Sequence, residues 1–157
     1  MAMHTWFECK IRYEKTMENG MQKKVTEPYL VDALSFTEAE ARIIEEMTPF
    51  ITGEFTVSDI KRANYSELFP SDEESADRWF KCKLIFITLD EKSGAEKKTS
   101  TQVLVQAADL RDAVKKLDEG MKGTMADYQI GMVSETPLMD VYPYSAGPND
   151  KPEFDPS

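Results

Sequence analysis

The chain of 157 residues carries a formal net charge of −10, has a sequence pI near 4.7 and is 41% hydrophobic. This length and apolar fraction suit a single domain with a sizeable core. The acidity excludes bulk, non-specific binding to nucleic acid or to acidic lipid. No apolar run approaches the roughly 18–20 residues of a membrane span, so we expect no membrane association.

The first predicted elements are two strands joined by a tight turn. Residues 5–15 alternate between apolar and polar with period two, which is typical of a half-buried strand. Asn19-Gly20 supplies a hairpin turn, and a returning strand follows over 23–33. Pro28 cannot donate a ladder hydrogen bond, so we expect an edge or a bulge at this point of the returning strand.

A helix and a third strand complete the first half. Ser35 and Glu38 form a capping box, in which each side chain accepts from a backbone amide at the start of the helix. Apolar residues then recur at helical spacing as far as Pro49, which ends the helix. A strand is predicted near 53–65, and the acidic segment 71–76 is expected to be a solvated linker.

The second half repeats this order. Strands are predicted over 78–89 and 97–107, around a turn at Ser93-Gly94. A helix capped by Asp109 follows, and a third strand is predicted near 126–136.

The two halves are also alike residue by residue. At a spacing of 73 (79 − 6), Trp6, Phe7, Cys9 and Lys10 recur as Trp79, Phe80, Cys82 and Lys83. At a spacing of 74 (104 − 30), Leu30, Val31, Ala33, Ala39 and Met47 recur as Leu104, Val105, Ala107, Ala113 and Met121. Near the end of each half, Leu68-Phe69-Pro70 corresponds to Val141-Tyr142-Pro143. Such a pattern indicates a duplicated unit.

The predicted fold is α+β, built from a duplicated ββαβ unit with pseudo-two-fold symmetry. A mainly antiparallel six-stranded sheet would carry two helices on one face. We expect one domain over residues 4–143, in which repeats 4–70 and 77–143 are joined by the linker 71–76 and share a core. Residues 144–157, rich in Pro, Gly and Asp, are expected to form a flexible tail.

Two three-stranded sheets packed face to face, with the helices outside, are the alternative topology. The positions of Trp6 and Trp79 distinguish the two arrangements. The sandwich buries both rings, whereas the single open sheet exposes at least one of them.

The sheet face opposite the predicted core is the candidate binding surface. In both halves, period two places a tryptophan and a lysine on it about 13 Å apart, at about 3.3 Å per residue. An open face of this kind can stack bases on its rings and neutralise phosphates with its cations. Alternatively, each tryptophan packs against a neighbouring strand, a terminus or another subunit. The candidate ligand- or partner-binding residues are Trp6, Lys10, Arg12, Trp79, Lys81 and Lys83.

No catalytic, cofactor or metal-binding motif stands out. His4 is the single histidine and lies beside the N-terminus, which makes catalysis by a histidine base implausible. Cys9 and Cys82 lack a CxxC pair and a secretory signal, so we expect buried free thiols in a reducing, cytoplasmic compartment. A disulfide would require the symmetry axis to bring the two first strands together. We expect no cofactor, no metal and no enzymatic activity.

Three segments carry a resemblance to a known family: HTWFECKIRYEK, LVDALSFTEAEARI and the closing DVYPY. With them the chain resembles an uncharacterised family of small bacterial and phage proteins, a domain of unknown function, from about His4 to Tyr144. The resemblance implies a soluble intracellular protein. It brings no ligand and no catalytic residue.

The leading functional hypothesis is a non-enzymatic binding or adaptor protein. It would act through protein–protein contacts or self-association, with the edges at Pro28 and at the third strands open to an added strand. The alternative is nucleotide or single-stranded nucleic-acid binding on the tryptophan and lysine face. In that case tryptophan fluorescence should be quenched by short oligonucleotides, and affinity should fall with salt.

Overall fold

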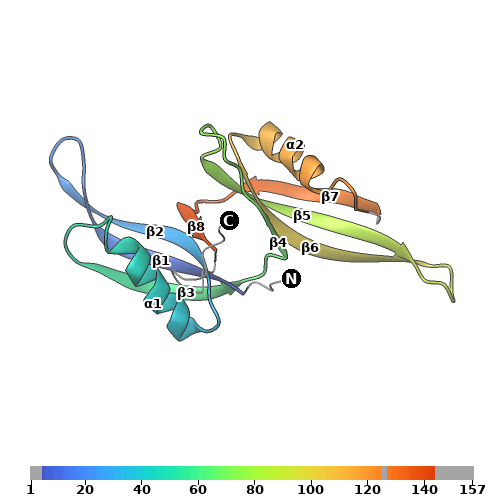
Figure 1. Ribbon diagram of the computed structural model, residues 1–157, viewed down its shortest axis with the longest axis horizontal. Helices are drawn as coiled ribbons and strands as arrows, with labels where there is room; N and C mark the ends of the chain where they lie inside the picture. The colour runs from blue at the N-terminus through green and yellow to red at the C-terminus, as the bar shows by residue number, and fades with distance from the viewer. Residues whose placement is uncertain (1–4, 125–126, 144–157) are drawn as a thin grey trace, which may run out of the picture. The chain divides into compact units, whose positions relative to one another are not determined.

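The computed structural model describes residues 5–124 and 127–143, which form two compact units (Figure 1). The first unit contains the described residues up to Ala63 together with those from Met139. The second unit contains Asn64–Leu138. Each unit has one helix that covers one face of its own four-stranded sheet (Figure 1).

The first sheet has the strand order β3-β1-β2-β8. Strand β1 lies between β2 and β3 and is antiparallel to both, whereas β8 is parallel to β2. The elements of the unit are β1 (Trp6–Thr16), β2 (Gln22–Asp32), α1 (Phe36–Met47), β3 (Phe55–Ala63) and β8 (Asp140–Tyr142).

The second sheet, read as β7-β5-β6-β4, has the same order and the same strand directions. Here β5 lies between β6 and β7, and β4 is parallel to β6. The elements of the unit are β4 (Glu67–Phe69), β5 (Arg78–Leu89), β6 (Glu96–Ala107), α2 (Leu110–Gly120) and β7 (Asp127–Glu135).

Glycines and a proline in the sequence explain where the hairpins turn and where the β2–β8 pairing begins. Gly20 and Gly94 have positive φ angles of 83° and 72°, as the tight hairpin turns require. Strand β2 lies next to β8 only over its last residues, and the carbonyl of Pro28 accepts from the Met139 amide at 2.9 Å. In the described structure, the part of β2 up to Pro28 has no strand on this side. Pro28 therefore lies on an edge, as predicted.

Both helices begin with the predicted caps. The Ser35 hydroxyl accepts from the Glu38 amide at 3.1 Å, and the Glu38 carboxylate accepts from the Leu34 amide at 2.6 Å. In the second unit, the Asp109 carboxylate accepts from the amide of Asp112 at 2.8 Å. Each cap satisfies amides that the first helical turn leaves without an intrahelical partner.

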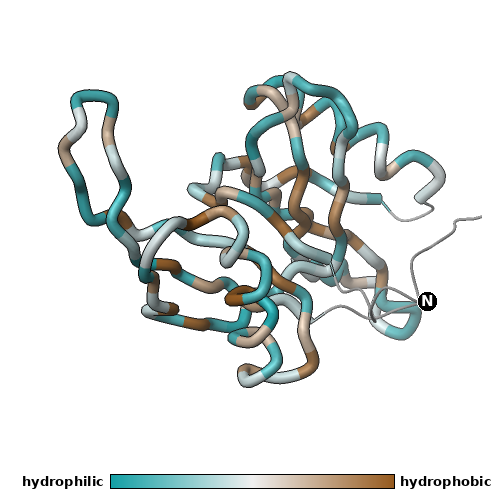
Figure 2. Tube along the Cα trace, turned by 60° about the vertical axis from the view of Figure 1, so that its left-hand side comes forward, coloured by the Kyte–Doolittle hydropathy of each residue, from teal (hydrophilic) through white to brown (hydrophobic). Residues whose placement is uncertain are grey.

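Each unit has its own hydrophobic core between the helix and the sheet. Hydrophobic stretches of the trace lie in the strands rather than at the hairpin tips (Figure 2). The first core contains Phe7, Cys9, Ile11, Val31, Ala33, Ala39, Ile43 and Met47. The second contains Phe80, Cys82, Leu84, Val103, Val105, Ala107, Ala113 and Leu117. Met121, the counterpart of Met47, is only partly buried.

The predicted single six-stranded sheet is wrong, because the strands form two mixed sheets of four. Strands β8 and β4 pair with the outer edges of β2 and β6, so the two sheets do not join through those edges. Two separate sheets, the alternative, are nearer to the observed fold, but each has four strands instead of three. The predicted shared core is wrong, because each unit has a core of its own, and the single domain over residues 4–143 stays a prediction. His4, the start of the third strand predicted near 126 and the tail 144–157 lie outside the described residues.

Replacing Phe80 with Ala should lower the free energy of unfolding by about 3–5 kcal/mol, because a large buried ring leaves a cavity. Phe80 is 2% exposed. Phe50 is 76% exposed, so the matched variant Phe50→Ala should change stability by no more than about 0.5 kcal/mol. Guanidinium denaturation followed by circular dichroism measures both. Equal losses for the two variants would contradict the assigned core.

Candidate functional site

Each sheet binds one short strand that comes from a distant part of the chain. Strand β4 follows β3 of the first unit in the sequence, yet it pairs with β6 of the second. Strand β8 follows β7 of the second unit, yet it pairs with β2 of the first. The first sheet is therefore completed only after the chain has passed through the second unit, whereas β4 lies at the start of the second unit. We call the β2 edge at Tyr29–Val31 together with α1 the first slot, and the β6 edge at Val103–Val105 together with α2 the second slot.

The two strands that fill the slots share one chemical pattern. Glu67-Leu68-Phe69-Pro70 and Asp140-Val141-Tyr142-Pro143 both read acidic, aliphatic, aromatic, proline. In the parallel ladders Leu68 lies opposite Leu104, and Val141 lies opposite Leu30. The proline ends the strand because it has no amide proton to continue the ladder.

The aromatic residue of each short strand packs against the core of the unit that it enters. Tyr142 stacks on Tyr29, with ring centroids 6.2 Å apart and planes inclined by 21°. Burial, helped by the charges of Asp140 and Glu46, raises the pKa of Tyr142 to about 12. The phenol is therefore neutral at physiological pH, which suits its half-buried position.

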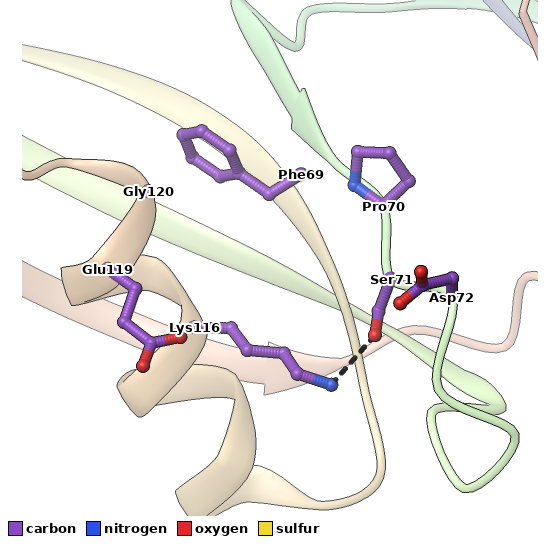
Figure 3. Close-up of a pocket in the computed structure, with 7 residues that line it drawn as sticks. All are labelled: Phe69, Pro70, Ser71, Asp72, Lys116, Glu119 and Gly120. Atoms are coloured by element: carbon purple, nitrogen blue, oxygen red, sulfur yellow. Dashed lines mark hydrogen bonds between the residues drawn. The ribbon is translucent and has the colours of Figure 1, made fainter.

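Phe69 is the counterpart of Tyr142 in the second slot, and it depends on a glycine in α2. A Cβ atom built on Gly120 would lie 2.8 Å from Cε1 of the Phe69 ring. Figure 3 shows the ring beside the last turn of α2, where Gly120 lies. The missing side chain at this position thus leaves the space that the ring occupies.

A cation on each helix holds the chain just beyond the short strand. Arg42 of α1 and Lys116 of α2 are 74 residues apart (116 − 42), which is the spacing of the repeat. One guanidinium nitrogen of Arg42 donates to the Pro143 carbonyl at 3.1 Å, and the other donates to the Asp32 carbonyl. Lys116 donates to the Ser71 hydroxyl at 3.0 Å (Figure 3). We call Arg42 and Lys116 the latch cations.

The ammonium group of Lys116 has an acceptor for each of its protons. Besides Ser71, it lies 2.9 Å from a carboxylate oxygen of Glu73 and 3.0 Å from one of Asp112. Partial desolvation disfavours its charge, but the hydrogen bonds to Glu73 and Asp112 outweigh this and raise the pKa of Lys116. The Ala108 amide, followed by Lys116, lowers the pKa of Asp112. Lys116 therefore stays charged and clamps the segment after β4 onto α2.

A shallow pocket of about 600 Å³ lies beside this clamp. Figure 3 shows its walls, which come from the end of β4, the segment after it and the last turns of α2. The ammonium of Lys116 already has three acceptors, and the carboxylates of Asp72 and Glu119 also line the pocket. The charge of the pocket therefore does not favour an anion. The pocket is better described as the open side of the second slot than as a small-molecule site.

The structure places half of the predicted site residues on each sheet. Trp6, Lys10 and Arg12 lie on β1, whereas Trp79, Lys81 and Lys83 lie on β5. Both tryptophans are buried, at 1% and 5% exposure. Lys10 and Lys81 are half-buried, and Arg12 and Lys83 are exposed.

The slots and the latch cations were not predicted from the sequence. A signal was present, because the repeat pairs Leu68-Phe69-Pro70 with Val141-Tyr142-Pro143 and Arg42 with Lys116. Three residues are too few for a strand period, however, and no pattern along the chain says which sheet they join.

Both cysteines are buried free thiols in the described structure, as predicted. Burial, followed by the charges of Glu8, Asp59 and Glu40, raises the pKa of Cys9 to about 12. Burial alone raises the pKa of Cys82 to about 11. Because the thiolate is the reactive form, neither side chain is suited to nucleophilic chemistry at neutral pH.

Iodoacetamide at pH 8 should alkylate both cysteines of the native protein at least about a hundredfold more slowly than in guanidinium. A pKa two units above the ordinary value lowers the thiolate fraction by about that factor, and burial adds to it. Intact-mass spectrometry against time measures the rates. Rapid alkylation of either cysteine in the folded protein would contradict the assigned environment.

Replacing Gly120 with Ala should destabilise the protein by about 1–3 kcal/mol, because the added methyl meets the Phe69 ring. In an unobstructed helix the same change stabilises by up to about 1 kcal/mol. In a Phe69→Leu background the cost should be smaller by at least about 1 kcal/mol, as expected of residues in contact. Guanidinium denaturation of the four proteins gives this double-mutant cycle. Additive effects would show that Gly120 does not shape the slot.

The described residues show no group of three or more His, Cys, Asp or Glu side chains arranged to hold a metal ion. None of the described helices is long and apolar enough to span a membrane. Among curated proteins, no match to the chain was found, and no solved structure matched it either. Residues 5–144 match the family described as a domain of unknown function, DUF4494. This match covers most of the sequence, including both slots, and the chain belongs to that family.

Proposed function

We propose that the protein is a non-enzymatic binding or adaptor protein that engages a protein partner by strand addition at β7. The observation that carries the proposal is the chemistry of this edge. Strand β7 is the outermost strand of its sheet, and its residues Tyr128–Ser134 include no charged side chain. An edge strand offers backbone donors and acceptors that an extended segment can pair with.

Comparison with β3, which holds the same place in the first sheet, supports the choice of β7. Strand β3 carries Asp59, Lys61 and Arg62, and charges of this kind protect an edge from pairing. Both strands contain a bulge at the corresponding point, opposite Lys10–Ile11 in one sheet and Lys83–Leu84 in the other. Since the bulges are shared, the difference in charge distinguishes the two edges.

The ends of β7 indicate what the partner carries. Asp127 and Glu135 flank the uncharged stretch, and the whole chain has a net charge of −10. We infer that the partner segment is extended, has an uncharged, β-forming middle and carries Lys or Arg near both ends. The overall acidity would also speed the approach of a basic partner.

Two further features support a binding protein over an enzyme. The thiols of Cys9 and Cys82 are buried and held protonated, and the Lys116 ammonium is held by three acceptors. Nucleic-acid binding is supported less well, because the buried rings of Trp6 and Trp79 cannot stack on bases. The remaining support for it comes from the cations Lys10, Arg12, Lys81 and Lys83.

We also propose that the chain arose by duplication of a ββαβ unit followed by one short strand. The repeat in the sequence supports this, as do the matching strand orders of the two sheets. The charge difference between β3 and β7 then means that the two copies have diverged in function.

A peptide-display selection on the immobilised full-length protein tests the binding proposal. The enriched peptides should share an uncharged, β-forming middle and a basic residue near each end. For such a peptide, the double variant Asp127→Lys/Glu135→Lys should weaken binding about tenfold, because two favourable cross-strand pairs become repulsive. Fluorescence anisotropy at fixed salt measures the affinity, and the reversed variant should prefer peptides with acidic ends.

The double variant Glu91→Lys/Glu96→Lys is the matched control. It makes the same change in net charge at exposed residues of the β5–β6 hairpin, and it should leave affinity within about twofold. Equal effects of the two double variants would show that only overall charge matters. Enriched peptides without the expected pattern would place binding elsewhere. If the partner is a second copy, light scattering at micromolar concentration should show a dimer that the Asp127→Lys/Glu135→Lys variant weakens.

A further inference from the structure

We propose that the first slot is an exchangeable binding site. Strand β8 leaves β2, and β8 of a second copy of the chain takes its place, so that two molecules hold each other by reciprocal strand exchange. This proposal concerns a different edge from β7 and does not depend on strand addition there.

Within residues 5–124 and 127–143, few interactions hold β8 in the first slot. Tyr29–Val31 pair with β8 there, whereas eight residues of β1 pair with β3. Beyond the ladder, the strand is held by the Tyr142–Tyr29 stack, the Arg42 bond to Pro143 and the Met139–Pro28 hydrogen bond. A segment held by so few bonds belongs to the part of a protein that opens most readily.

The second slot is tied more firmly. The segment before β4 is anchored by Ser66, whose amide and hydroxyl both donate to the Gln102 carbonyl. After β4, Lys116 binds both Ser71 and Glu73, and the Ser71 amide donates to the Gln106 side chain at 2.9 Å. The strand that exchanges is therefore β8 rather than β4.

The connection that leads into β8 is short. The amide and hydroxyl of Thr136 donate to the Trp79 carbonyl at 2.8 and 2.9 Å, which fixes the start of the connection in the second unit. The Met139 amide, bonded to Pro28, fixes its end in the first unit. Only Pro137 and Leu138 lie between these two anchors. Short hinges, especially ones stiffened by proline, favour exchange of the following element between copies.

The slot already accepts a strand that is remote in the sequence, so nothing in its chemistry requires the donor to belong to the same molecule. A second copy offers the same Asp140-Val141-Tyr142-Pro143 segment and makes the same contacts. The closed and exchanged forms then differ mainly in the hinge and in the repulsion between two chains of charge −10. Exchange should increase with protein concentration and with salt.

Cysteine pairing between two full-length variants tests the exchange. In the ladder, Tyr29 lies opposite Asp140. Cys9 lies directly opposite Tyr29 on β1, so both proteins also carry Cys9→Ala, which prevents a disulfide within one molecule. When Tyr29→Cys and Asp140→Cys proteins of this background are mixed under mild oxidation, a disulfide between positions 29 and 140 can form only between two molecules. We expect a covalent heterodimer that forms at least about ten times faster than with the control pair Lys24→Cys and Asp140→Cys. Lys24 is an exposed β2 residue outside the ladder with β8, so its rate reports random collision.

Two additional changes show whether the disulfide reports insertion into the slot. Val141 is 7% exposed, so Val141→Asp in the Asp140→Cys donor should reduce the rate to that of the control. Arg42→Gln in the Tyr29→Cys acceptor should raise the rate, because it removes the latch. Circular dichroism verifies that each variant is folded, and Tyr142→Ser replaces Val141→Asp if the latter is not. A rate equal to that of the Lys24→Cys pair, or one unchanged by the donor substitution, would overturn the proposal.

Discussion

The fold depends on one constraint: in each sheet, one edge of a long strand is completed by a short strand from another part of the chain. Without β8, Tyr29–Val31 would keep their pairing with β1 but lose their partners on the opposite side, and the first core would lose the Tyr142 ring. Without β4, the second core would lose Phe69. Buried backbone groups are costly to leave unpaired. The completion of the first sheet therefore depends on a segment that follows the whole second unit in the sequence.

The long elements could be predicted from the sequence because their signals are local. Period-two alternation marks β1 and β5, Gly20 and Gly94 mark the hairpins, and the Ser35 and Asp109 caps mark the helix starts. Each of these features is decided within a few residues of the chain. The sheet to which a strand belongs is decided by partners far away, and the prediction of one six-stranded sheet failed at that step.

The short strands and the candidate site could not be predicted from local sequence patterns, because they too depend on distant parts of the chain. Alternation places Trp6 and Lys10 on one face of β1, but it does not tell whether that face is covered. The ring of Trp6 is buried, whereas Arg12, further along the same strand and on the same side, is exposed. Likewise, the sequence places Arg42 and Lys116 at matching positions, but their roles follow only from their bonds to Pro143 and Ser71, one and two residues beyond the short strands.

The two halves keep what completes the sheets and differ in what they present outward. Both have an aromatic residue, a proline and a latch cation at matching positions. The outer strands are under no such constraint, and there Asp59, Lys61 and Arg62 of β3 contrast with the uncharged Tyr128–Ser134 of β7. A charged edge resists pairing, whereas an uncharged one invites it. Strand pairing is thus the means by which this chain completes its own sheets, and the proposed binding at β7 would use the same chemistry.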